Sequence, residues 1–528
     1  MDKSRTSRRI ITAAAVAALP LTAVLVGFAS ASTPTATCAT RVHGDFNGDG
    51  HADIAAGEPS RTVGTVTEAG AIHIVPSNST GTGMTTAGNQ YVDETTWGLP
   101  ATSGDHFGYA VASGFFNDDC YADVAIGVPG ANNGIGEIVM FLGSATGIAP
   151  AGMDVFSPGA LNADDLTGDK FGSALTVGDF NHDGFDDLAA GAPGDDGGAG
   201  AVGVLYGGPT GLTAAGGGWF NQDTGAVPGA REANDNFGYA LAAGDFNADG
   251  FSDLAVGAPF EDIGTTSNAG TIDLLPGSAA GITATGSTAF DESTSGVPDD
   301  PETNDEFGYA LAAGDITHDG AADLAVGAPG ESIGTHTGAG QVTVLLGTHT
   351  ATGLTATGSK VWNQDSTSVP GATENNDLFG TALTIGDFNG DHFGDLAVGD
   401  MNEAIGTATN SGAIVVLYGT STGLTGTGSQ LWSQDSTGIP GVAEANDRFG
   451  KSVSAVNFTS SHADLIIGVY GEGTDPWLNN GGISYMRGST AKTGLSVTGW
   501  QFFSSGGVSG GAQNCNTHTY LGMGFSLS

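Results

Sequence analysis

Residues 237–259 read FGYALAAGDFNADGFSDLAVGAP, and residues 307–329 repeat them almost letter for letter as FGYALAAGDITHDGAADLAVGAP. Each copy holds an F-G pair, a segment of small residues, an aspartate-rich loop, an apolar segment and the triplet G-A-P. Self-similarity at a fixed period indicates a repeat architecture, in which one small unit is stacked on its neighbours. The fold is therefore expected to follow from this unit and the number of its copies.

The unit occurs seven times along the 528 residues, and successive loops start 64 to 72 residues apart. Each unit contains four short runs typical of strands, and no stretch shows a helical period. The pattern predicts an all-β fold. The loops start at Asp45, Phe115, Asp179, Asp245, Asp315, Asp387 and Asn457.

Units that cannot bury both faces alone must stack, either as an open solenoid or as a closed ring. The last residues, LGMGFSLS (521–528), resemble FGYALAAG, whereas CATRVHGDF (38–46) leads into the first loop without an F-G pair. A C-terminal strand beside N-terminal residues would close a ring and remove its edges. We therefore predict a seven-bladed β-propeller of four-stranded blades over residues 38–528, closed by the C-terminal strand, with a Cys38–Cys515 disulfide at the closure.

The charge of the chain excludes some classes of partner. Its formal net charge is −44, from 57 acidic and 13 basic residues, so it repels phosphate backbones and anionic membranes. Binding to nucleic acid is not expected. An acidic surface can serve solubility alone, but here the acids recur at fixed spacing, which favours cations as partners.

The first 31 residues indicate export. They hold a basic start, an apolar stretch and the small residues Ala29-Ser30-Ala31, which are typical of a cleaved secretory signal peptide. SRRII (7–11) resembles a twin-arginine signal. An uncleaved anchor is the alternative, because the apolar run approaches membrane-spanning length. We predict a secreted, extracellular protein without a membrane span after cleavage, with glycosylation sequons at Asn78 and Asn457.

The repeated loop has the chemistry of a cation site. In the first copy, Asp45, Asn47, Asp49 and Asp53 occupy positions 1, 3, 5 and 9, and Gly50 at position 6 permits a sharp turn. Oxygen ligands at this spacing suit Ca²⁺, with a backbone carbonyl from position 7. No nitrogen or sulfur ligand recurs, which disfavours zinc and copper. An Asx-rich turn that binds nothing is the alternative, and recurrence in five copies favours the cation.

The copies differ in completeness. Thr317 replaces asparagine in the fifth loop, and His392 replaces glycine in the sixth. In the second, Phe115 and Cys120 occupy positions 1 and 6, and the seventh (457–464) is one residue short, so neither is expected to bind metal. We predict about five Ca²⁺ sites of mainly structural role, two of them weaker. The complete loops start at Asp45, Asp179 and Asp245.

The F-G pair, the D-x-N-x-D-G-x-x-D loop and the G-A-P triplet together resemble the FG-GAP repeat family, found in the integrin alpha-chain N-terminal propeller. The resemblance covers roughly residues 38–528 and implies calcium loops on one face and ligand-binding loops on the other. The implied side-chain ligands are Asp45, Asn47, Asp49, Asp53, Asp179, Asn181, Asp183, Asp187, Asp245, Asn247, Asp249, Asp253, Asp315, Thr317, Asp319, Asp323, Asp387, Asn389, Asp391 and Asp395. The implied backbone ligands belong to His51, Phe185, Phe251, Ala321 and Phe393.

The resemblance implies a secreted binding module of adhesion type, with an extracellular protein or glycan as ligand. The polar segments before each F-G pair, such as residues 363–377, are candidates for the ligand surface or are solvated connectors. A hydrolase-associated propeller related to glycosylphosphatidylinositol phospholipase D is the alternative, although no catalytic residues are identified. GTSTG (419–423) matches a serine-nucleophile pattern, but equivalent turns lack the serine. Altered triplets at 399–401 and 468–470 predict less regular geometry in the last two blades.

Overall fold

The computed structural model describes residues 41–504, apart from 440, 460, 473–480 and 490–492. Every element described below belongs to one compact unit, Thr33–Ser528. The predicted signal peptide, Cys38, Cys515 and the predicted closing strand at 521–528 lie outside the described residues.

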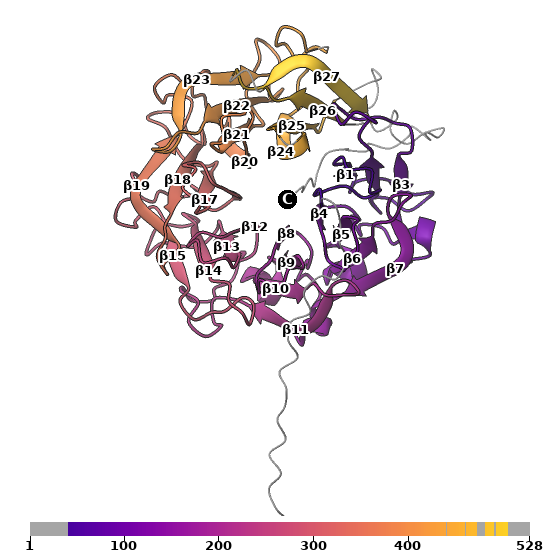
Figure 1. The fold of residues 1–528 in the computed structure, drawn as a ribbon. Coiled ribbons are helices and arrows are strands. Elements are labelled where there is room, and N and C mark those ends of the chain that lie inside the picture. Colours follow the sequence, from indigo (N-terminus) through magenta and orange to yellow (C-terminus); the bar gives the residue numbers. More distant parts are fainter. Residues whose placement is uncertain (1–40, 440, 460, 473–480, 490–492, 505–528) are drawn as a thin grey trace, which may run out of the picture. The chain divides into compact units, whose positions relative to one another are not determined.

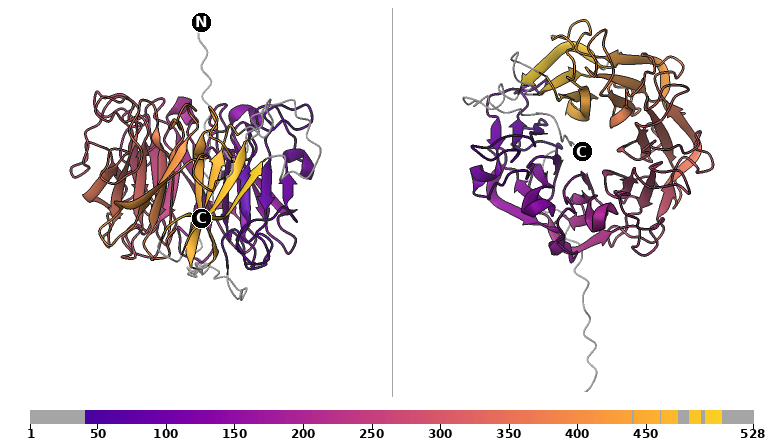
Figure 2. Two further views of the ribbon diagram at one scale, coloured as in Figure 1. Left: turned by 90° about the horizontal axis from the view of Figure 1, so that it is seen from above. Right: turned by 180° about the vertical axis from the view of Figure 1, so that it is seen from behind.

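Within this unit, seven antiparallel sheets stand in a ring around a central axis (Figure 1). Each sheet is one repeat, and its strands follow one another in chain order from the axis outward. The strands run between the two faces of the ring, as the side view in Figure 2 shows. The predicted all-β, seven-bladed β-propeller is confirmed.

The strands are as follows, blade by blade. The first blade has β1 (Ile54–Gly57), β2 (Ile72–Val75) and β3 (Gln90–Val92); the second has β4 (Ala110–Gly114), β5 (Asp123–Val128), β6 (Glu137–Leu142) and β7 (Ala149–Phe156). The third has β8 (Leu175–Gly178), β9 (Asp187–Ala192), β10 (Ala201–Tyr206) and β11 (Thr213–Phe220); the fourth has β12 (Ala240–Gly244), β13 (Asp253–Ala258), β14 (Thr271–Leu275) and β15 (Thr288–Phe290). The fifth has β16 (Ala310–Gly314), β17 (Asp323–Ala328), β18 (Gln341–Gly347) and β19 (Leu354–Trp362). The sixth has β20 (Phe379–Gly386), β21 (Asp395–Asp400), β22 (Ala413–Tyr418) and β23 (Thr425–Trp432); the seventh has β24 (Phe449–Thr459), β25 (His462–Val469), β26 (Gly482–Arg487) and β27 (Ser496–Ser504).

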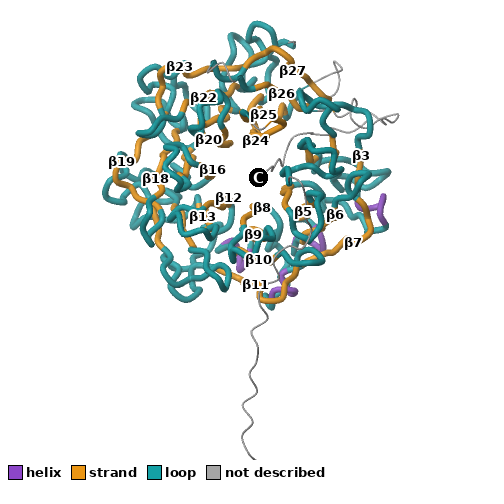
Figure 3. Tube along the Cα trace, viewed as in Figure 1, coloured by secondary structure: helices purple, strands orange, loops and turns teal. Residues whose placement is uncertain are grey.

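Helix is confined to short turns in the described residues (Figure 3). These are η1 (Glu94–Trp97), α1 (Ala131–Gly134), η2 (Pro158–Leu161) and α2 (Asp195–Gly198).

The core of the ring lies between blades. β13 is buried along its whole length, because the neighbouring blades cover both of its faces, which explains its uninterrupted apolar run. Phe246 and Ile272 of the fourth blade, for example, share one apolar cluster with Leu324 and Val326 of the fifth. The innermost strands of the fourth and fifth blades, β12 and β16, are mostly half-buried, since one side faces the axis.

Among the described residues, the F-G pair of one blade meets the G-A-P triplet, or its altered form, of the preceding blade. At the fourth junction, Phe307 is fully buried and its amide donates to the Ala269 carbonyl oxygen at 2.9 Å. Gly308 follows with φ +93°, and a Cβ at this position would lie 2.7 Å from the Thr271 carbonyl oxygen. A Cβ on Gly257 of the G-A-P triplet would lie 2.1 Å from the Gly308 carbonyl oxygen. Both glycines are therefore required, because the backbones of adjacent blades touch there.

The last two blades keep the strand order of the others. Each consists of four paired strands, although the triplet reads GDM at 399–401 and GVY at 468–470. The contact that matters is made by the glycine, which both altered triplets keep. A Cβ on Gly399 would lie 2.2 Å from the Gly450 carbonyl oxygen, as at the fourth junction. Less regular geometry is seen in the pairing of the first two strands, which shifts register at Phe379/Ala382 in the sixth blade and at Phe449/Ser452 in the seventh. The equivalent pairs of the second to fifth blades have no such shift.

The ring closes between the seventh and first blades through side-chain packing. Ile54 and Val75 share an apolar cluster with Phe458 and Tyr485. The first blade has three strands among the described residues, so the closing strand at 521–528 stays a prediction. Cys120 is engaged in a disulfide. With three cysteines in the chain, this bond competes with the predicted Cys38–Cys515 pair, which also stays a prediction.

Candidate metal loops and ligand face

The aspartate-rich loops fold around their own position-1 carboxylate. In the fourth blade, Asp245 Oδ1 accepts a hydrogen bond from the Asp249 amide at 3.0 Å, and Oδ2 accepts one from Gly250 at 2.9 Å. Asn247 Oδ1 accepts from the Asp249 amide at 2.8 Å, and Asp249 Oδ1 accepts from Phe251 at 3.0 Å. Gly250 has φ +92°, as the predicted sharp turn requires. The same hydrogen bond, from the position-5 amide to Oδ1 of the position-1 aspartate, occurs in the loops that start at Asp45, Asp179, Asp315 and Asp387.

The aspartate at position 9 begins the second strand of the second to sixth blades and ties that strand to the third. Asp253 Oδ1 accepts a hydrogen bond from the Gly277 amide at 2.9 Å, immediately after β14. The same bond occurs in the second and seventh blades, whose loops are not predicted to hold metal: Asp123 accepts from Gly143 at 2.9 Å and Asp464 from Gly488 at 2.8 Å. Position 9 therefore has a structural role that does not need a cation, which sequence reasoning missed.

Three predicted ligand atoms are buried without a hydrogen-bond partner. They are Asp253 Oδ2, Thr317 Oγ1 and Asn389 Oδ1, one from each of three loops. A buried polar oxygen without a partner is costly, and a bound cation would satisfy it. These loops therefore offer oxygen atoms of the kind that Ca²⁺ prefers, which fits the predicted group. The carboxylates at positions 1, 5 and 9 are not gathered tightly: in the described residues, the sets of three acids within 4.8 Å lie outside these loops.

The position-9 carboxyls are electrostatically strained. Burial raises the pKa of each, backbone hydrogen bonds lower it, and the carboxylates at positions 1 and 5 raise it further. The pKa is raised to about 7 for Asp53, about 8 for Asp187, about 7 for Asp253, about 6 for Asp323 and about 8 for Asp395. A divalent cation would remove this strain by neutralising the cluster.

Each loop is also attached to the next blade. The Asp245 carbonyl oxygen accepts a hydrogen bond at 2.9 Å from the amide of Ala322, at position 8 of the following loop. The Phe246 carbonyl oxygen accepts another from Thr348 at 2.9 Å. A cation in the loop would therefore stiffen the joint between two blades as well as one hairpin.

The second loop differs as expected from its sequence. Phe115 occupies position 1, and the Arg41 guanidinium lies 5.0 Å from the centre of its ring. Arg41 also donates to the Asp119 carbonyl oxygen at 3.4 Å. The positively charged side chain of Arg41 thus lies beside the second loop. The absence of metal from the second and seventh loops stays a prediction.

The comparisons with known proteins agree with this architecture. The family model of the FG-GAP repeat matches residues 42–75, 171–205, 237–275, 307–345 and 379–417. The chain carries five FG-GAP repeats. They contain the five loops with predicted metal ligands.

The FG-GAP segments resemble parts of much longer curated proteins. Phosphatidylinositol-glycan-specific phospholipase D of Mus musculus is 32% identical over 161 residues, which are 29% of this chain and 18% of that protein. Integrin alpha-PS5 of Drosophila melanogaster is 35% identical over 162 residues, 30% of this chain and 15% of that one. Integrin alpha-V of Gallus gallus is 32% identical over 236 residues, 41% and 19% of the two chains. The matched part is less than a fifth of each relative.

The face opposite the metal loops has a different character. It is built by the connections between the second and third strands and by those that lead into the next blade. At its centre lies a cavity of about 670 Å³. Tyr109, Tyr239 and Tyr309, each directly after an F-G pair, line it together with Lys451. The rings of Tyr239 and Tyr309 are 5.0 Å apart, and burial lowers the pKa of Lys451.

Sequence reasoning did not identify this cavity as a site. The residue after F-G is tyrosine in three blades, which was a usable signal. In the other described blades with this motif it is Ser173, Thr381 or Lys451.

Proposed function

We propose that this FG-GAP protein is an exported, calcium-stabilised propeller that binds an extracellular protein or glycan on the face opposite its metal loops. The observation that carries the proposal is the contrast between the two faces. One face presents nearly the same loop in five blades, whereas the other surrounds a cavity with side chains that differ from blade to blade. Residues that support the fold repeat from blade to blade, whereas residues that would contact a ligand vary between blades.

Calcium is the cation that the loops suit best, because their ligands are carboxylate, amide and carbonyl oxygens. Its role is to stabilise the folded ring, since a cation that binds only the folded state shifts the unfolding equilibrium. At a free concentration 100 times its dissociation constant, each site would contribute about 2.7 kcal/mol.

The cavity chemistry favours a ligand with polar and flat surfaces. Three tyrosines supply rings for stacking and hydroxyls for hydrogen bonds, and Lys451 supplies a cation at the same opening. Sugars and protein side chains both fit this set, and the resemblance to integrin alpha chains supports an adhesion-type role. The net charge of −44 opposes a nucleic-acid ligand.

Export rests on the predicted signal peptide at residues 1–31. Amino-terminal sequencing of the protein recovered outside the cell should give Ser32 as the first residue. Among the described residues, none of the helices is long and apolar enough to cross a membrane.

The calcium role is tested by melting the full chain in Ca²⁺ and in chelator. Asp253→Asn, in a complete loop, should lower the calcium-induced rise in melting temperature. Asp464→Asn is the matched control, because it removes the same position-9 carboxylate from a loop that is not predicted to bind metal. Equal calcium shifts in the wild type and in Asp253→Asn would refute the proposal.

The ligand face is tested by screening the chain against glycan arrays and extracellular proteins. Tyr239→Ala should reduce binding of any captured ligand by roughly 5- to 150-fold, since a stacking ring contributes on the order of 1–3 kcal/mol. Thr422→Ala, exposed on the metal-loop face, should leave binding unchanged. If Thr422→Ala loses binding and Tyr239→Ala keeps it, the ligand binds the metal-loop face, which would refute the proposal.

A hydrolase-associated propeller is the second candidate, favoured by the similarity to phosphatidylinositol-glycan-specific phospholipase D. Screening against phosphodiester and ester substrates would decide between the two. If the chain turns over such a substrate and a single substitution outside the metal loops abolishes this turnover, the hydrolase proposal replaces the binding proposal.

A further inference from the structure

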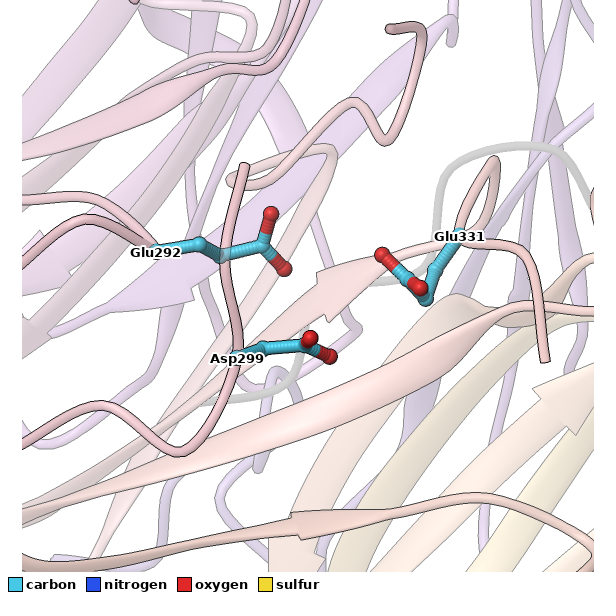
Figure 4. Close-up of side chains that lie close together, drawn as sticks. All are labelled: Glu292, Asp299 and Glu331. Carbon is cyan, nitrogen blue, oxygen red and sulfur yellow. The ribbon is translucent and has the colours of Figure 1, made fainter. Parts of the chain in front are cut away.

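A second type of acidic cluster lies on the cavity face, at the junction between the fourth and fifth blades (Figure 4). Glu292 and Asp299 belong to the connection that follows β15, and Glu331 belongs to the loop after β17. Figure 4 shows the carboxylates of Glu292 and Asp299 pointing toward that of Glu331. One oxygen of each lies within 4.8 Å of the other two. Glu302 and Asp305 form an overlapping group with Glu331 at the same spacing.

Glu292, Asp305 and Glu331 of this cluster are buried, Asp299 is half-buried and Glu302 is exposed, and not all of the buried oxygens have a hydrogen-bond partner among the described residues. Glu292 is 2% exposed and Glu331 is 3% exposed, and Oε2 of each has no hydrogen-bond partner among the described residues. Gln341 Nε2 donates to Asp299 Oδ2 at 2.6 Å and to Glu292 Oε1 at 3.3 Å. Within the described segments, no lysine or arginine forms an ion pair with these acids. Buried carboxylates without a counter-charge require a proton or a cation.

The other junctions show what is unusual here. At three of them, a glutamine occupies the position of Glu292 and donates to the glutamate equivalent to Glu331. These pairs are Gln222 with Glu261 at 3.0 Å, Gln364 with Glu403 at 3.0 Å, and Gln434 with Glu472. At the fourth junction both positions carry carboxylates, so the internal donor is replaced by a second acceptor.

We propose that Glu292, Asp299 and Glu331, together with Asp305 and Glu302 of the overlapping group, bind a hard divalent cation such as Ca²⁺ or Mn²⁺. A set made only of carboxylates suits hard cations and excludes those that need nitrogen or sulfur ligands. Glu331 is shared by both groups of three, which places the cation next to it. The bound cation links the loop after β17 to the connection after β15, and so fastens the fourth blade to the fifth on the cavity face. The site is separate from the aspartate-rich loops and does not depend on them.

The test uses Mn²⁺ alone as the probe, on crystals of the full chain soaked after chelation. We expect an anomalous difference peak between Glu292 and Glu331. Glu292→Gln should remove that peak and leave peaks in the aspartate-rich loops. This variant should fold, because it recreates the glutamine–glutamate pair of the other three junctions. Asp253→Asn is the reciprocal control, which should affect only its own loop.

A peak that persists in Glu292→Gln, or no peak at this junction in the wild type, would overturn the inference. In the second case protons, not a cation, neutralise the cluster. If the aspartate-rich loops also stay empty, the proposed calcium sites fail separately, so the two failures are distinguishable. Calorimetric titration of the wild type and Glu292→Gln with Mn²⁺ in solution should show one bound cation fewer in the variant, and equal stoichiometry would contradict the crystal result.

Discussion

Replacing Gly257 by alanine tests whether the glycine contact between blades holds the ring together. A Cβ at this position would lie 2.1 Å from the Gly308 carbonyl oxygen of the next blade, so the two backbones would have to separate by roughly 1 Å. Overpacking of a well-packed interior costs about 1–3 kcal/mol. The upper half of that range is expected, because backbone atoms cannot move aside as a flexible side chain can. Gly257 is not in the left-handed region, so the cost is steric alone.

Gly264→Ala is the matched control within the same blade. Gly264 has φ +66° and would place its Cβ in open space, so alanine there suffers conformational strain without a steric clash. That strain costs about 1–2 kcal/mol, and the lower entropy of the unfolded chain offsets about 0.4–1 kcal/mol of it. The two variants therefore separate the clash from the general cost of removing a glycine.

Thermal unfolding at a fixed Ca²⁺ concentration provides the measurement. An unfolding entropy of about 2 cal/mol/K per residue means that ~1 kcal/mol shifts the melting temperature of a chain this long by about 1 °C. Gly257→Ala should lower the melting temperature by about 2–3 °C, and Gly264→Ala by about 1 °C or less. If the two variants melt together, the close approach of Gly257 to Gly308 does not govern stability, and the physical explanation given for the motif is wrong.

Three further predictions follow from buried groups. Burial, with the charge of Glu261, raises the pKa of Asp273 well above its ordinary value, so the stability from its bound proton is complete at about pH 4 and is lost as pH rises. Asp273→Asn should therefore raise the melting temperature at pH 8, by about 1 °C per pKa unit of elevation, and leave it nearly unchanged at pH 4; equal effects would contradict this. Asp123→Ala should destabilise the chain by about 2–4 kcal/mol in Ca²⁺ and in chelator alike, because it leaves the Gly143 and Phe116 amides without acceptors; a calcium-dependent loss would reveal a metal in the second loop. Non-reducing peptide mapping of exported protein should show one disulfide that includes Cys120, whereas a free Cys120 beside a Cys38–Cys515 bond would favour the pairing predicted from sequence.

The repeated residues explain why the fold was predictable. An F-G pair and a G-A-P triplet recur where backbones of adjacent blades touch, so their spacing gives the number of blades directly. The polarity of each strand follows from the same geometry, since the buried second strand has no polar face. The altered triplet GDM keeps this contact, because its first residue, Gly399, carries it. Asp400 beside it is buried with no hydrogen-bond partner for either carboxylate oxygen among the described residues.

The candidate sites were less predictable, because they depend on contacts between distant segments. The loop ligands could be named from their spacing within nine residues. Glu292 and Glu331 are separated by a whole blade junction, and no local pattern places them together. A signal did exist: aligned repeats read N-Q-D at 221–223 and 363–365 but D-E-S at 291–293. This difference in sequence can be interpreted only when the structure shows that the middle residue of the three faces the glutamate of the next blade.

The two faces of the ring are thus fastened by different means. On the metal-loop face, backbone bonds such as that from Ala322 to Asp245 join adjacent blades, and position-9 aspartates tie the second strand to the third within a blade, with or without a predicted cation. On the cavity face, three junctions carry a glutamine–glutamate pair, whereas the junction between the fourth and fifth blades carries the acidic cluster at Glu292. Because the first set already holds the blades in place, the second can change without loss of the fold. Side chains on the cavity face can therefore vary to suit the proposed ligand, and a cation at Glu292 would order the loops closest to that proposed surface.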